Sequence, residues 1–265
     1  MVARVLISLL FAVASSAWGG QPRQLCLSCH PVHYAERGGC SGCHLGNPAA
    51  ARKNIAHAGL RGGKYARFTL GNTVQNKESE QLLEQLACRR CHVSGGRGNR
   101  LAVSLDAAAA RRTADELALS IRHPVANMPD FALREEQITT LVNAVLADSR
   151  GRHGDEGAPV KVHFTTAGTQ KKDVFSTKCG SCHRLLSQRL AALGTGGIGP
   201  NLSGLLSPWY PKTFRNGEVW NSKNLALWLK NPRAVRPEAR MLPVPLTVAE
   251  LKELEALLVV SEVVK

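Results

Sequence analysis

Apolar residues recur with the spacing of an α-helix near the middle of the chain. They stand at positions i, i+3, i+4, i+7 and i+8, namely Ile138, Leu141, Val142, Val145 and Leu146. This period gives a helix one continuous apolar face. We expect that face to pack on an earlier helix that carries three leucines, Leu82, Leu83 and Leu86.

Two Thr-x-x-Glu patterns predict where further helices begin. Thr113 with Glu116, and Thr247 with Glu250, have the spacing of a capping box, in which each residue bonds the backbone N–H group of the other. The expected fold class is therefore all-α.

Composition indicates several small parts rather than one large core. The chain has 265 residues, of which 44% are hydrophobic but only 5% aromatic, and 24 glycines with 13 prolines divide it into short segments. Something other than packed aromatic side chains must therefore help to fill the interiors.

The first 20 residues have the pattern of a secretory signal. Arg4 supplies the positive charge, residues 5–14 are apolar, and small residues follow near Gly19. We expect residues 1–20 to be removed on export to the periplasm. The alternative, an N-terminal membrane anchor, is disfavoured because the apolar run is short for a span of about 20 residues. The later apolar run at 257–260 follows Lys252, Glu253 and Glu255, so we expect no transmembrane segment after cleavage.

All eight cysteines fall into four copies of one motif, Cys-x-x-Cys-His. The cysteines are Cys26, Cys29, Cys40, Cys43, Cys88, Cys91, Cys179 and Cys182, and the histidines are His30, His44, His92 and His183. Two thiols one helical turn apart can bind the two vinyl groups of a haem, and the adjacent imidazole then binds the iron. The sequence therefore predicts four covalently bound haem c groups.

Three other uses of paired cysteines explain the pattern less well. Disulfides are common in exported proteins, but they do not require a histidine after every second cysteine. Zinc sites do not require it four times either. A thioredoxin-like redox motif would account for one copy at most.

Two methionines are the candidate sixth ligands of the third and fourth haems. Apart from Met1, the chain has only Met128 and Met241, each shortly before a proline and a predicted helix. This arrangement resembles that of class I cytochrome c domains, in which a loop methionine binds the iron. The alternative for both is core filler.

The resemblance to class I cytochrome c domains covers residues 67–150 and 161–265. In the second of these it includes residues 199–204, Gly-Pro-Asn-Leu-Ser-Gly, and residues 228–232, Trp-Leu-Lys-Asn-Pro. It implies that the carbonyl of Pro200 accepts a hydrogen bond from His183. In the first domain, Asn99-Arg100-Leu101 replaces the expected Gly-Pro-x-Leu. The resemblance therefore identifies no acceptor for His92.

The N-terminal segment, residues 21–66, carries two motifs in about 45 residues and should have little regular structure, with its haems packed on each other. Three extended residues span about 10 Å at most, so His33 cannot reach the far side of the haem held by His30. We expect His33 to bind the iron held by His44, and His57 the iron held by His30. Solvent-facing or hydrogen-bonded roles are the alternative for both.

The remaining histidines carry less information. His123 competes with Met128 as a ligand, or is a surface or core residue. His153 lies in a stretch rich in glycine and acidic residues that predicts a linker at residues 151–160, and His163 follows it.

With these ligands, two haems would be bis-His and two His/Met. Methionine raises the potential of a haem relative to histidine, so electrons should pass from the N-terminal pair toward the C-terminal half.

The formal net charge of +14 overstates the charge of the mature protein. Eight haem propionates and the loss of Arg4 would reduce it to about +5. Arg233, Arg236 and Arg240 lie near Met241, where they could steer acidic redox partners or anionic substrates. The alternative is a solvated surface that also pairs with propionates. Nucleic acid is not expected as a partner of an exported protein.

At the level of the whole chain, the order of parts resembles the multihaem cytochromes encoded with bacterial selenite- and tellurite-reduction operons. The stretches that carry the resemblance are residues 31–34, 52–57, 87–92, 124–129 and 201–208. It implies a component of an extracytoplasmic electron conduit in anaerobic respiration, with other cytochromes or membrane quinone-linked complexes as partners.

Two classes of function remain open at this point. With six-coordinate irons the protein is an electron carrier rather than an enzyme. If one haem loses a weak sixth ligand, the open iron makes a terminal reductase or peroxidase acting on an oxyanion or peroxide.

Overall fold

The computed structural model describes residues 25–125, 127–152 and 173–260. The chain divides into two compact units, residues 1–60 and residues 61–265. The sequence predicts the end of the N-terminal segment at residue 66, whereas residues 61–66 belong to the second unit, in whose core Tyr65 is buried. The predicted signal at 1–20 and most of the predicted linker at 151–160 lie outside the described residues.

In residues 25–60, the described part of the first unit, the structure contains only short helical turns. They are the 3-10 helices η1 (Leu25–Ser28) and η2 (Ala35–Arg37) and the α-helices α1 (Cys40–His44) and α2 (Lys53–Ala56). None of its described side chains is fully buried. Residues 25–60 therefore form no apolar core of their own.

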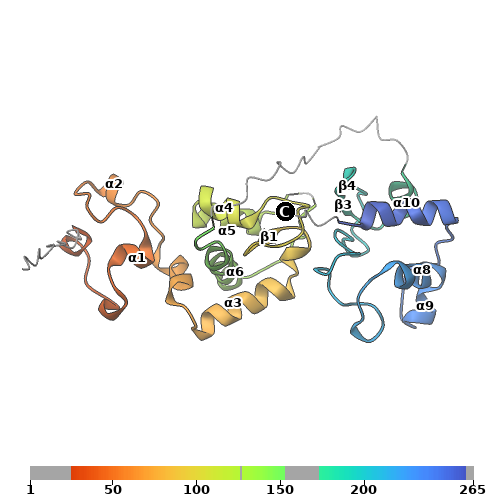
Figure 1. The fold of residues 1–265 in the computed structure, drawn as a ribbon, viewed down its shortest axis with the longest axis horizontal. Coiled ribbons are helices and arrows are strands. Elements are labelled where there is room, and N and C mark those ends of the chain that lie inside the picture. The colour runs from red at the N-terminus through yellow and green to blue at the C-terminus, as the bar shows by residue number, and fades with distance from the viewer. Residues whose placement is uncertain (1–24, 126, 153–172, 261–265) are drawn as a thin grey trace, which may run out of the picture. The chain divides into compact units, whose positions relative to one another are not determined.

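The first core of the second unit is helical and centred on α6. Its elements are η3 (Gly63–Tyr65), η4 (Arg67–Leu70), α3 (Val74–Gln85), η5 (Cys88–Arg90), α4 (Leu105–Arg111), α5 (Ala114–Arg122) and α6 (Glu135–Asp148). All five positions of the predicted apolar face on α6 are buried, and α6 packs against α3, α4 and α5 (Figure 1). The predicted pairing of α6 with the leucine-bearing helix α3 is confirmed.

A second core lies in residues 173–260. Its elements are α7 (Val174–Lys178), η6 (Arg215–Gly217), α8 (Ser222–Lys230), α9 (Pro232–Val235) and α10 (Val248–Leu258). Phe175 on α7 is fully buried and packs with Leu254 and Leu258 on α10. Burying each such side chain contributes roughly 1.5–3 kcal/mol. The all-α fold class is confirmed, because helices dominate both cores.

Both predicted capping boxes are present. The backbone N–H of Thr113 donates to the carboxylate of Glu116 at 2.7 Å, and the Glu116 N–H donates to the Thr113 hydroxyl at 3.2 Å. Thr247 and Glu250 make the same pair of bonds, at 2.7 and 3.2 Å. These reciprocal bonds satisfy N–H groups that have no partner inside the helix and fix the starts of α5 and α10.

Two small antiparallel hairpins interrupt the helical pattern. Strands β1 (Val93–Ser94) and β2 (Arg97–Gly98) form the first, and β3 (Leu185–Ser187) and β4 (Ala191–Leu193) form the second. Each begins within two residues of a motif histidine. The carboxylate of Asp106 accepts from the N–H groups of Gly95 and Gly96 at 2.8 and 2.9 Å, which holds the first turn in place.

In the part of the chain that the structure describes, no helix is both long enough and apolar enough to cross a membrane.

Candidate haem-binding sites

All four Cys-x-x-Cys-His motifs fold into one turn of helix. The second motif is α1 itself. In the other three, the histidine N–H donates to the carbonyl of the first cysteine, at 3.0 Å for His30, 3.0 Å for His92 and 2.9 Å for His183. Residues at i, i+3 and i+4 lie on the same face of a helical turn, so each turn groups two thiols with one imidazole.

The cysteines of the motifs are not joined in disulfides. All eight cysteines lie in the described ranges and none forms a disulfide. Burial raises the pKa of Cys88 and of Cys179 to about 11 and raises that of Cys91. These thiols are therefore protonated at neutral pH, which makes them poor ligands for a metal ion on their own.

In the first unit, the motif histidines lie beside the two histidines proposed as their partners on iron. Nε2 of His33 is 3.2 Å from Nε2 of His44. The ring centroids of His30 and His57 are 6.0 Å apart. Metal–imidazole bonds are about 2.0–2.1 Å long, so two nitrogens on opposite sides of one ion stand about 4 Å apart. The two pairs are thus compatible with the crossed ligation. The rings of His33 and His44 would have to move slightly apart, because their Nε2 atoms are 3.2 Å from each other.

In the second unit, each motif histidine donates its Nδ1 proton to a backbone carbonyl. His183 donates to Pro200 at 2.8 Å, as the resemblance to class I cytochrome c domains implied. His92 donates to Val103 at 2.7 Å. Burial lowers the pKa of His92, so its imidazole is neutral at physiological pH. A neutral ring with the proton on Nδ1 leaves Nε2 free to bind a metal.

The two candidate methionine ligands are each half-buried. Met241 packs against the second core, and its sulfur accepts a hydrogen bond from Nε1 of Trp228 at 3.1 Å. The N–H of Met128 donates to the carbonyl of Val125 at 2.8 Å in a turn that follows α5. The competing candidate His123 is exposed at the end of α5. His153 and His163 lie outside the described residues.

The arginines proposed to steer anions have different local roles. Arg236 donates to the carbonyl of Thr213 at 2.6 Å and lies 5.3 Å from the ring centroid of Trp228. Arg233 donates to the carbonyl of Ala239 at 3.3 Å, whereas the side chain of Arg240 is exposed. At least two of these three guanidinium groups therefore stabilise the loop that carries Met241.

Sequence reasoning missed a buried arginine inside the third motif. Arg89 is only 1% exposed and forms ion pairs with Glu84 and with Asp148, the latter at 2.6 Å. Its Nε also donates to the carbonyl of Ser94 at 3.1 Å. These bonds fasten the motif to the end of α6 and to the first hairpin. The motif itself gave no signal for them, because Asp148 is 59 residues away.

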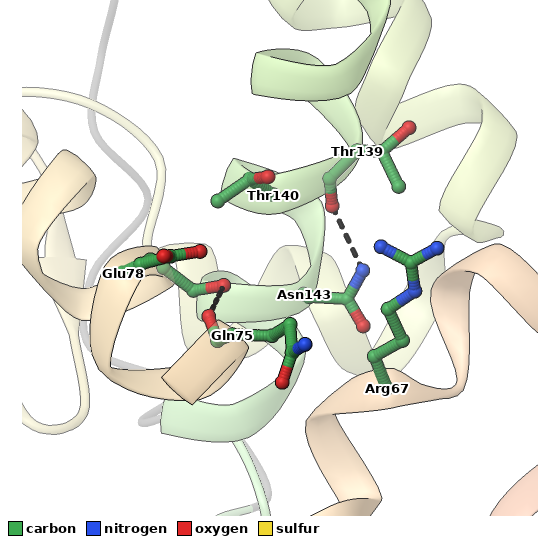
Figure 2. A pocket seen from close by; sticks show the side chains of 7 residues that line it. Arg67, Gln75, Glu78, Thr139, Thr140 and Asn143 are labelled. Carbon is green, nitrogen blue, oxygen red and sulfur yellow. Dashed lines mark hydrogen bonds between the residues drawn. The ribbon is translucent and has the colours of Figure 1, made fainter. Parts of the chain in front are cut away.

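A small polar pocket lies among η4, α3 and α6, away from the motifs (Figure 2). The amide of Asn143 donates to the carbonyls of Thr139 and Lys64, each at 2.9 Å, and accepts from the N–H of Phe68. The Ser79 hydroxyl donates to the carbonyl of Gln75 at 2.8 Å. Because these buried groups already have partners within the protein, the pocket is a packing feature.

Comparisons with known proteins find similarity to cytochrome c proteins in the middle of the chain. Residues 74–143 match the family described as "Cytochrome C oxidase, cbb3-type, subunit III". The chain is also similar to the cytochrome c of Tetrahymena pyriformis, with 32% identity over 71 residues, which is 26% of this chain and 65% of that protein. The match therefore spans slightly less than two thirds of the relative's length. No solved structure is significantly similar to the chain.

Proposed function

We propose that this chain, which contains a cytochrome c domain, is a periplasmic tetrahaem cytochrome that transfers electrons between redox proteins. The observation that carries the proposal is the shared geometry of the four motifs, each a helical turn that groups two thiols outside any disulfide with one histidine. Haem c bound there supplies a one-electron couple at each iron. The protein holds and orients the groups and tunes their potentials.

The ligand pairs define an order of potentials. His30 with His57, and His44 with His33, are the bis-His pairs of the first unit. His92 with Met128, and His183 with Met241, are the His/Met pairs of the second. Methionine stabilises the reduced iron relative to histidine, so electrons run from the first unit to the second. Four components of equal potential in a redox titration would contradict this order.

Location and partners follow from the export signal proposed at residues 1–20. The donors and acceptors are other cytochromes or quinone-linked membrane complexes, and the proposed setting is an extracytoplasmic conduit like those encoded with selenite- and tellurite-reduction operons. The exposed Arg240 near Met241 is available to attract an acidic partner.

Haem counting tests the main proposal. Mass spectrometry of the exported protein should show removal of the signal and the mass of four haems. The pyridine haemochrome assay should give four haems per chain. A colourless protein, or one with zinc or disulfides at the motif cysteines, would overturn the proposal.

The crossed ligation is tested by removing one haem of the pair. In a Cys40→Ser, Cys43→Ser variant, the first unit keeps only the haem of His30. A further His57→Ala change should make that haem high-spin, whereas a further His33→Ala change should leave it low-spin. The opposite result would show uncrossed ligands. The His57→Ala and His33→Ala variants are thus matched controls for each other.

A ligand-binding experiment separates the carrier from a terminal reductase or peroxidase. All irons of the carrier are six-coordinate, so its low-spin spectrum should not change within seconds of adding carbon monoxide or cyanide. A rapid change at one haem would instead show an open iron and favour the enzyme.

A further inference from the structure

The two helical cores of the second unit meet at the third haem motif. Cys91 of that motif and Leu101 behind it are buried against Leu186, which belongs to the hairpin that follows the fourth motif. The second core thus covers one of the two thiols that would hold the third haem.

A polar contact beside this apolar patch is centred on Arg90, two residues before His92. Its Nη1 donates to the carbonyl oxygen of Asn201 at 3.2 Å, and its guanidinium lies 5.6 Å from the ring centroid of Tyr210. The Tyr210 hydroxyl donates to the same carbonyl oxygen at 3.2 Å. One backbone acceptor in the second core therefore binds the third motif directly.

Asn201 links this contact to residues beside the proposed iron ligands of both haem sites. It directly follows Pro200, whose carbonyl accepts the proton of His183. Its side-chain Nδ2 donates to the carbonyl of Asn127, the residue before Met128, at 3.0 Å. One residue thus adjoins the proximal side of the fourth site and the methionine loop of the third.

A second hydrogen bond joins the two helical cores of the second unit. Nδ2 of Asn99 donates to the hydroxyl of Ser207 at 2.7 Å and to the carbonyl of Arg90 at 2.8 Å. Gly204 packs so closely that a Cβ atom there would lie 2.6 Å from the Arg90 carbonyl oxygen. The two surfaces therefore fit without space for a further side chain.

We propose that the contact of Arg90 and Asn99 with residues 201–207 is an internal electron-transfer junction between the haem held by His92 and the haem held by His183. This inference rests on the proposed function. In each transfer, ferrous iron at one site is oxidised to ferric and ferric iron at the other is reduced to ferrous. One electron moves, and no covalent bond forms or breaks.

Arg90 has two roles at the junction. Its hydrogen bond keeps the two sites in contact. Its charge acts on both irons, since a nearby positive charge stabilises the reduced form, which carries one positive charge less. The distinctive consequence is that a substitution within the third motif changes the potential of the fourth haem.

The test compares Arg90→Met with Arg97→Met in the full four-haem protein. Arg97 is an exposed arginine of the same core, and its ion pair with Glu80 has a long distance of 3.8 Å. NMR-resolved redox titration follows the methyl signals of each haem. In Arg90→Met, the reduced-to-oxidised ratio of the His183 haem at fixed potential should fall about tenfold, or about 59 mV for one electron. Arg97→Met should change it much less.

Asn99→Ala provides a variant that leaves the charge unchanged. After rapid photoreduction, electron exchange between the two haems should slow about tenfold in Arg90→Met and measurably in Asn99→Ala. Potentials in Asn99→Ala should stay near those of the parent protein. If Arg90→Met does not mature, Asn99→Ala decides the question through its exchange rate.

Haem counting separates failure of this inference from failure of the proposed function. If the parent protein lacks haem at the third or fourth motif, the proposed function is wrong. If all four haems are present, but electron exchange and the potential of the His183 haem in Arg90→Met match those in Arg97→Met, the proposed junction is wrong. The proposed electron-carrier function is then unaffected.

Discussion

Nδ1 of His92 lies 2.7 Å from the carbonyl oxygen of Val103. A carbonyl oxygen only accepts hydrogen bonds, so the imidazole proton is on Nδ1 and Nε2 is free for a metal. His183 obtains the same arrangement from Pro200 at 2.8 Å, although the segment around Val103 lacks the Gly-Pro sequence found there. The two sites of the second unit thus fix the same tautomer with different loops.

The loop at the fourth site also packs against the face of its histidine, which gives a sharp prediction. A Cβ at Gly199 would lie 2.2 Å from Cε1 and 2.5 Å from Nδ1 of His183. Gly199→Ala should therefore push the ring off the Pro200 carbonyl and cost about 1–3 kcal/mol through overpacking. Haem counting should show loss at the fourth motif.

The neighbouring glycine is the matched control for Gly199→Ala. A Cβ at Gly197 would meet no atom within 4 Å. Gly197→Ala should therefore keep four haems and the parent stability. Equal haem loss in both variants would show that the loop, rather than the ring contact, is sensitive.

The buried ion pair of the third motif predicts a large change in stability. Asp148→Ala removes the carboxylate that accepts from Arg89, whose guanidinium is buried, and from the Ser94 hydroxyl. The free energy of unfolding of the second unit should fall by about 2–3 kcal/mol in urea denaturation, because a buried charge loses a partner. Glu80→Ala breaks an exposed pair and should cost under about 0.5 kcal/mol. Similar losses in the two variants would contradict the assigned role of Asp148.

Sequence reasoning succeeded where the signal is local and periodic. The buried face of α6 follows from the spacing of Ile138 to Leu146, and both Thr-x-x-Glu boxes begin helices as predicted. The crossed histidine pairs were predicted from the short separation of His30 and His33 along the chain. They stay a prediction that the geometry supports.

Sequence reasoning failed where the hydrogen-bond partner of a site residue is a backbone atom or is distant in the chain. The acceptor for His92 is a main-chain oxygen, and any residue can supply one, so Val103 gives no sequence signal. The Gly95-Gly96 pair between β1 and β2 is typical of a hairpin turn and could have been recognised. The residues that connect the second hairpin, 188–190, have no such signature, and Ala191 at the start of β4 has a φ of +59°.

The capping box of α10 predicts a defined pH dependence. Hydrogen bonds from the backbone and hydroxyl of Thr247 hold the pKa of Glu250 below its usual 4.5. The folded state therefore binds the Glu250 proton less readily than the unfolded state. The stabilisation is complete above pH 4.5 and is lost as the pH falls through the lower folded-state pKa.

Urea denaturation of Glu250→Gln beside the parent protein measures this effect. The glutamine keeps the capping bond but not the charge. The parent should be more stable at neutral pH, and the difference should disappear as the pH falls below 4.5. In a Thr247→Ala background the difference should shrink only in part, since the hydroxyl bond that helps to lower the pKa is gone but the bond from the backbone N–H of residue 247 remains. A difference that persists at low pH would refute the assignment.

The hydrogen bond from Trp228 to the sulfur of Met241 predicts how the fourth haem is tuned. A donor on the sulfur withdraws electron density that would otherwise stabilise ferric iron. Trp228→Phe keeps an aromatic ring but removes the N–H, so the reduction potential of the His183 haem should fall and the methionine-to-iron absorption band should shift. Trp220→Phe is the control, because Trp220 donates to Thr213 instead, at 2.9 Å. If the absorption band is absent from the parent protein, Met241 is not the ligand. If the band is present but Trp228→Phe leaves both it and the potential unchanged, Met241 binds iron without help from Trp228.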